Sequence, residues 1–201
     1  METLLRGSRA IDRLSMTVGK SVMWLILVAV LVSAGNAIVR KLFNYSSNAW
    51  LELQWYLFGA AFMLVSASTL LQNEHIRIDI FYGTRTRRTQ HWIDLLGHVF
   101  FLMPFVILAT WLLVPYVWTA YSTGEMSANS GGLIIWPARA FLLAGFFLLV
   151  LQGISEIVKK IAVMQGLIED PTPFISAHDA AELEGAALAA EVARLAAEDR
   201  K

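Results

Sequence analysis

The chain has 201 residues, of which 57% are hydrophobic and only 16% charged, and its formal net charge is zero. Soluble domains carry about a quarter charged residues, so this composition argues against an ordinary soluble protein, and the neutral charge gives no sign of nucleic-acid binding. The chain has no cysteine, which excludes disulfides, thiol redox pairs and cysteine metal sites.

The first twenty residues form a basic segment with a weak apolar stripe. Ile11, Leu14 and Val18 are spaced as on one face of a helix. The basic residues of the segment are Arg6, Arg9, Arg13 and Lys20. We expect residues 1–20 to be a cytoplasmic amphipathic segment with a short helix on the membrane surface, with an irregular solvated loop as the alternative.

Four long apolar blocks follow this segment. The stretch between Lys20 and Arg40 holds nineteen residues without a charge, Leu53–Asn73 holds twenty-one, and Leu95–Gly124 holds thirty. A fourth stretch, Ala140–Ser155, has sixteen. A helix needs about twenty mainly apolar residues to cross a bilayer core of about 30 Å. The sequence therefore predicts an all-α membrane protein with a transmembrane domain over residues 21–165 and spans at about 21–40, 51–72, 94–118 and 134–158.

Two alternatives to four spans are disfavoured. A soluble helical bundle would show polar stripes at helical spacing, and Leu95–Val117 shows none. A cleaved signal peptide would have a shorter flank before its apolar core and would not be followed by three further spans.

The link after the second span, "QNEHIRIDIFYGTRTRR" (72–88), is again rich in charged residues. A short interfacial helix with Ile76, Ile80 and Phe81 on one face is expected, with an irregular loop as the alternative. Basic and aromatic side chains near span ends anchor helices at the membrane surface. The expected anchors are Arg77, Arg85, Arg87, Arg88, Trp92 and Trp136.

Residues 166–201 differ in character from the spans. "EDPTP" (169–173) breaks the helix pattern, and residues 169–201 hold eight acidic and three basic residues in an alanine-rich stretch. We expect an acidic, helical cytoplasmic tail.

Lys and Arg counts predict the orientation. Ten of these residues lie before the first span, between the second and third, or after the fourth, whereas the opposite side has Arg40, Lys41 and Arg139. Since Lys and Arg concentrate in cytoplasmic loops, both termini are predicted to be cytoplasmic.

Polar residues inside the spans are the candidate functional residues. Glu52 and Gln54 open the second span and Arg139 begins the fourth, so Glu52 and Arg139 are expected to lie at similar depth and to form an ion pair. Gln152 and Glu156 share a helix face, and Lys160 is expected to pair with Glu156. We interpret these residues as structural or as a subunit interface; the alternative is a proton or cation site at Glu52 or Glu156.

The sequence offers few residues suited to catalysis. Only His98 among the four histidines falls within a span, so no pair of axial haem ligands exists at membrane depth. No nucleophile–base set, phosphate loop or metal spacing is present. We therefore expect no enzyme and no cofactor.

Several stretches resemble the small integral-membrane subunit of tripartite ATP-independent periplasmic (TRAP) transporters, the DctQ type. They are "AIDRLSMTVGK", "ELQWYLFGAAFML", "NEHIRIDIFY" and "GGLIIWPARAFLLAGFFLLVLQGISEIVKKI", which together cover most of residues 10–165. The acidic tail has no counterpart in the resemblance.

The resemblance implies a non-catalytic scaffold in the bacterial inner membrane, surrounded by lipid. Its partners would be a large multi-span permease subunit, which would carry the sodium and substrate sites, and a periplasmic substrate-binding protein. Uptake would be sodium-driven, with organic acids as substrates. Two other hypotheses remain: a self-sufficient small exporter or channel coupled through Glu52 or Glu156, and a membrane anchor for a redox enzyme, which the histidine placement argues against.

Overall fold

The computed structural model describes residues 1–45, 47–73, 82, 85–170 and 185, and its elements are helical. The helices are α1 (Glu2–Phe43), α2 (Asn48–Gln72), α4 (Arg87–Gly97), the π-helix η1 (His98–Leu102), α5 (Met103–Thr123) and α6 (Trp136–Met164). Within the described residues, four helical segments are long and apolar enough to cross a membrane: α1, α2, the run Arg87–Thr123 and α6. The predicted all-α membrane class with four spans is confirmed.

The first helix is much longer than the span predicted within it. α1 has 42 residues, which at the α-helical rise corresponds to about 63 Å, roughly twice the thickness of a bilayer core. The helix runs through Lys20 without a break and ends at Asn44, which adopts a left-handed conformation with φ 50°. The expectation of a separate surface helix before the first span is therefore wrong, because residues 2–20 continue the spanning helix.

The buried positions of α1 recur every seven residues: Ser8, Ser15, Val22, Ala29 and Asn36. A seven-residue repeat keeps one stripe of a long helix against its neighbours when the helices cross with a left-handed twist. The side chains in this stripe are small or medium-sized, which lets the helix backbones approach closely.

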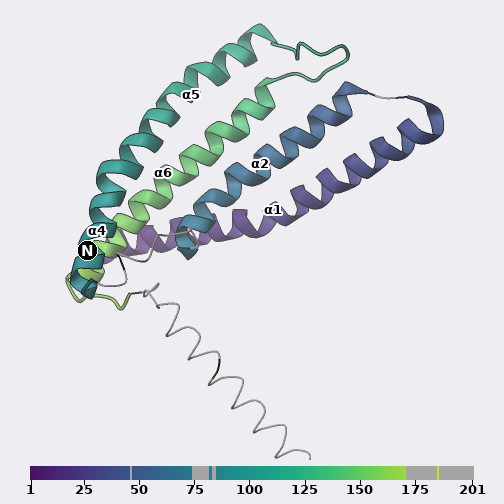
Figure 1. The fold of residues 1–201 in the computed structure, drawn as a ribbon. Coiled ribbons are helices and arrows are strands. Elements are labelled where there is room, and N and C mark those ends of the chain that lie inside the picture. The colour runs from purple at the N-terminus through teal and green to yellow at the C-terminus, as the bar shows by residue number, and fades with distance from the viewer. Residues whose placement is uncertain (46, 74–81, 83–84, 171–184, 186–201) are drawn as a thin grey trace, which may run out of the picture.

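The four long helices form an open layer rather than a closed bundle. Figure 1 shows them side by side in the order α5, α6, α2, α1. α2 packs between α1 and α6, α5 packs mainly on α6, and α1 also crosses α6. The apolar window of Arg87–Thr123 is only 11% buried, whereas that of α6 is 33% buried, which makes α6 the central helix.

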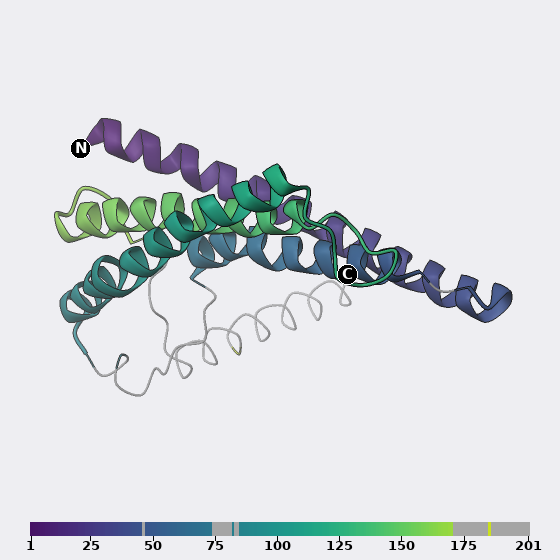
Figure 2. The same cartoon turned by 90° about the horizontal axis from the view of Figure 1, so that it is seen from above.

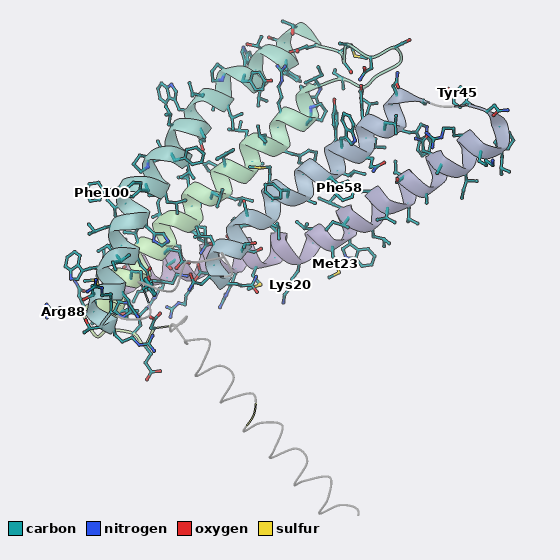
Figure 3. The ribbon with its side chains drawn as sticks, in the orientation of Figure 1. Lys20, Met23, Tyr45, Phe58, Arg88 and Phe100 are labelled. Carbon is teal, nitrogen blue, oxygen red and sulfur yellow. The ribbon has the colours of Figure 1, made fainter. Side chains whose placement is uncertain are left out.

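Two ends of the layer can be distinguished (Figure 2). The basic end holds Met1, α4 and the C-terminus of α6, and the loop end holds the α1–α2 connection and residues 124–135. Large apolar side chains such as Met23, Phe58 and Phe100 are exposed on the faces between these ends (Figure 3).

The α2–α6 contact depends on small residues. A Cβ added at Gly145 of α6 would lie 2.7 Å from both the Cβ and the carbonyl oxygen of Met63, so these backbones touch. The buried small residues of α2 are Ala60, Ala61, Ala67 and Ser68. Gly59 of the same helix has nothing within 4 Å of its added Cβ.

The third span contains a π-helical turn just before Pro104. Because proline has no backbone N–H, it disturbs the preceding helical turn, and a local π-turn is one way to absorb the disturbance. His98 begins this turn, and its Nδ1 lies 2.6 Å from the carbonyl oxygen of Asp94. The predicted surface helix at 76–81 and most of the tail lie outside the described residues.

Candidate functional site

A network of polar side chains joins α1 to α6 at the basic end. We call it the α1–α6 polar network; its members are Ser8, Asp12 and Ser15 on α1 and Gln152, Ser155, Glu156 and Lys159 on α6. The spacings of three and four residues place each set on one face of its helix. Two helix faces that each carry polar groups therefore meet inside the protein.

Gln152 is the centre of this network and is fully buried. Its Oε1 accepts a hydrogen bond from Ser15 Oγ at 2.7 Å. Its Nε2 donates to Asp12 Oδ1 at 2.9 Å and to Glu156 Oε1 at 2.8 Å. The amide thus uses its acceptor and its donor group together, which offsets the cost of burying it.

The charges of the network are also paired. Lys159 Nζ lies 2.6 Å from Glu156 Oε1 and 3.2 Å from both carboxylate oxygens of Asp12. Ser155 Oγ donates to Asp12 Oδ1 at 2.8 Å and lies 2.6 Å from Ser8 Oγ. Removing one member of such a buried set takes a hydrogen bond from each of its partners, so the network strongly favours a single α1–α6 arrangement.

The predicted pairing of Glu156 with Lys160 is wrong. Successive residues of a helix point about 100° apart, so Lys159 and Lys160 face different neighbours. Lys159 faces α1, whereas Lys160 Nζ lies 3.0 Å from Asp94 Oδ2 on α4. The shared face of Gln152 and Glu156 is confirmed by their hydrogen bond.

At the loop end, Glu52 fastens the α5–α6 loop to α2. Its carboxylate accepts hydrogen bonds from Ser127 Oγ, from Asn129 Nδ2 at 2.8 Å and from the backbone N–H of Leu133 at 2.6 Å. Glu52 itself is 5% exposed. The loop folds back on itself through a hydrogen bond of 2.9 Å from Ser127 N–H to the Leu133 carbonyl.

The predicted ion pair between Glu52 and Arg139 is not formed. Arg139 instead lies 2.7 Å from Glu125 of the same loop, and its guanidinium sits 3.7 Å from the centroid of the Tyr116 ring. Both charges do lie at one end of the layer, as predicted. The folded loop supplies a nearer partner for each, which sequence spacing does not reveal.

The remaining predicted residues lie outside these two clusters. Gln54 is half-buried on α2. Arg85, Arg87 and Arg88 are exposed near the start of α4, and Trp92 is 47% exposed. Trp136 lies at the opposite end of the layer, with its ring 5.6 Å from that of Tyr121. Arg77 is outside the described residues, and the anchoring role of the others stays a prediction.

Sequence reasoning missed the α1 half of the network. Asp12 is the one acidic residue between Arg9 and Lys20, and Ser8, Asp12 and Ser15 follow helical spacing. This pattern marks a polar helix face, but nothing in it identifies α6 as the partner. Across the part of the chain that the structure describes, no group of three or more His, Asp or Glu side chains is placed to hold a metal ion.

Comparison with known families decides what kind of protein this is. The family described as "Tripartite ATP-independent periplasmic transporters, DctQ component" matches residues 29–163. The chain belongs to this DctQ family. It is therefore a component of a transporter and a multi-pass membrane protein, not an enzyme.

The DctQ match covers some parts of the two clusters and not others. It includes Glu52, Arg139 and the α6 half of the polar network, whereas Ser8, Asp12 and Ser15 precede it. No curated protein and no solved structure matches the chain significantly.

Proposed function

We propose that this DctQ-family chain is the small membrane subunit of a sodium-driven, binding-protein-dependent transporter for organic acids, and that it braces the large transport subunit. The sodium and substrate sites are assigned to that large subunit. A periplasmic binding protein delivers the substrate. The chain lies in the bacterial inner membrane with both termini in the cytoplasm.

The α1–α6 polar network is the observation that carries the scaffold role. A brace must keep its own shape while a partner moves, and a buried, fully paired polar contact has only one well-satisfied arrangement. Gln152, at 0% exposure, ties a serine and two carboxylates together across the two helices.

The open layer supports a membrane partner. α5 packs mainly on α6, so most of its large apolar side chains face outward. An extended apolar face of a membrane subunit meets either lipid or other helices, and small residues along it favour close helix packing. Between α2, α5 and α6, Gly59 and Ala60 line a hollow of about 290 Å³ beside Tyr116 and Arg139.

The basic end supports the proposed orientation. Arg6, Arg9 and Arg13 lie at this end on α1, and Arg85, Arg87 and Arg88 near the start of α4. Cytoplasmic flanks are enriched in such residues, whereas the loop end has Arg40, Lys41 and Arg139, the last of them paired with Glu125.

A self-sufficient exporter would use Glu52 or Glu156 to carry a proton or cation. In the structure Glu52 accepts three hydrogen bonds from the loop and Glu156 is paired with Lys159. Both carboxylates already have partners suited to a structural role, so this alternative has no specific support.

Reconstitution in liposomes tests the proposed function. The chain alone should transport no organic acid under a sodium gradient, whereas uptake should appear when its large membrane subunit and binding protein are added. Transport by the chain alone, lost in Glu52→Gln or Glu156→Gln, would contradict the proposal and establish the exporter.

A further inference from the structure

A cavity of about 380 Å³ lies between α4 and the end of α6. Arg88, His91 and Trp92 of α4 line one side, and Val163 and Met164 of α6 line the other. None of these residues belongs to the α1–α6 polar network or to the Glu52 cluster. The cavity is therefore separate from both sites described above.

The α4 wall offers hydrogen-bond donors to an anion. Arg88 is exposed, and the first turn of α4 contains no acidic residue. His91 also lines the cavity, but its Nδ1 is buried, so a ligand in the cavity can reach only its other ring nitrogen, Nε2. The buried Nδ1 lies 3.8 Å from Asp170 Oδ2, which is equally far from Lys160 Nζ, so this carboxylate lies between two basic groups.

The rest of the cavity is apolar and lies where a membrane surface is expected. α4 continues through η1 into the third span, and Figure 3 shows Arg88 at the outer tip of the basic end. Trp92 is 47% exposed, as is common for tryptophan at the level of lipid headgroups. Val163 and Met164 offer no hydrogen bond but can contact methylene groups.

We infer that this cavity binds an anionic phospholipid, such as phosphatidylglycerol, by its phosphate. Arg88 and the Nε2–H of His91 donate hydrogen bonds to phosphate oxygens, and basic pockets at membrane surfaces bind lipid headgroups in this way. Trp92, Val163 and Met164 contact the methylene groups of the glycerol region. This apolar wall favours a lipid over free phosphate. The inference requires only that the chain spans a membrane and does not depend on the scaffold role.

Native mass spectrometry of the full chain in detergent tests the site. The protein is titrated with phosphatidylglycerol and, separately, with phosphatidylethanolamine of the same acyl chains, and lipid adducts are counted. The wild type should retain phosphatidylglycerol preferentially. Arg88→Gln should weaken that binding by roughly tenfold, the effect of losing one hydrogen bond between charged groups. His91→Ala should also weaken it.

Arg87→Gln is the matched control, because it removes the same charge from the neighbouring exposed position, and Arg87 does not line the cavity. It should leave phosphatidylglycerol binding within about twofold of the wild type, as expected for an exposed residue away from the site. Equal losses in Arg87→Gln and Arg88→Gln would overturn the site in favour of a general surface charge effect. Equal retention of the two lipids by the wild type, or displacement of the lipid by inorganic phosphate, would overturn it as well.

Discussion

Replacing Gln152 by alanine should destabilise the protein more than any other glutamine-to-alanine change in the described spans. The amide of Gln152 is fully buried and makes three hydrogen bonds, two of them to carboxylates. Asp12 would keep Ser155 and Lys159, and Glu156 would keep Lys159, whereas Ser15 would lose its acceptor. With membrane hydrogen bonds worth about 0.6 to 1.7 kcal/mol each and the cost of an orphaned hydroxyl added, the free energy of unfolding should fall by roughly 2 to 4 kcal/mol.

In the assay, the purified chain is unfolded in mixed micelles by raising the fraction of a denaturing detergent. Circular dichroism measures the loss of helix. Gln54→Ala is the matched control, since Gln54 is a half-buried glutamine on α2 that belongs to neither polar cluster. It should change the unfolding free energy by less than about 0.5 kcal/mol. Equal losses for Gln152→Ala and Gln54→Ala would refute the view that the network holds α1 on α6.

Three further predictions concern the other contacts of the layer. Because the chain has no cysteine and Ser8 Oγ lies 2.6 Å from Ser155 Oγ, the pair Ser8→Cys and Ser155→Cys should cross-link under mild oxidation, seen as a mobility shift reversed by reductant. Gly145→Ala should lower the unfolding free energy by about 1 to 3 kcal/mol, since the added Cβ would meet the backbone of Met63. Glu52→Ala should speed chymotrypsin cleavage within residues 124–135 several-fold, because the loop loses the acceptor of three hydrogen bonds.

Each of these changes has a control that the structure supplies. Arg9→Cys with Ser155→Cys should not cross-link, since Arg9 is exposed and lies about 100° around α1 from Ser8. Gly59→Ala has open space and should be neutral or stabilising by up to about 1 kcal/mol. Gln54→Ala should leave loop cleavage unchanged. Cross-linking by the Arg9 pair, a loss at Gly59 as large as at Gly145, or unchanged cleavage in Glu52→Ala would contradict the respective assignment.

The four spans were predictable because crossing a bilayer requires a run of apolar residues whose length can be counted. The start of α1 was not predictable. Arg13 and Lys20 precede the apolar run and mark where that run begins, but the helix continues beyond them toward the N-terminus. A helix that leaves the membrane core can continue as long as its polar face finds partners. Here Ser8, Asp12 and Ser15 find them on α6.

The candidate site divides in the same way. The shared face of Gln152 and Glu156 follows from local helix spacing and was predictable. The partners Asp12 and Ser127 lie far away in the sequence from the residues that they bind, and no local pattern connects them. The wrong Glu52–Arg139 pairing came from equal depth alone, which takes no account of a loop that folds between two charges.

The most direct test of the scaffold proposal is to tag this chain in its native membrane, extract it gently and identify by mass spectrometry what accompanies it. The proposal predicts a larger multi-span protein in stoichiometric amount, bound in the wild type but reduced in Gln152→Ala. A chain that is recovered alone, or only with copies of itself, would contradict the scaffold role.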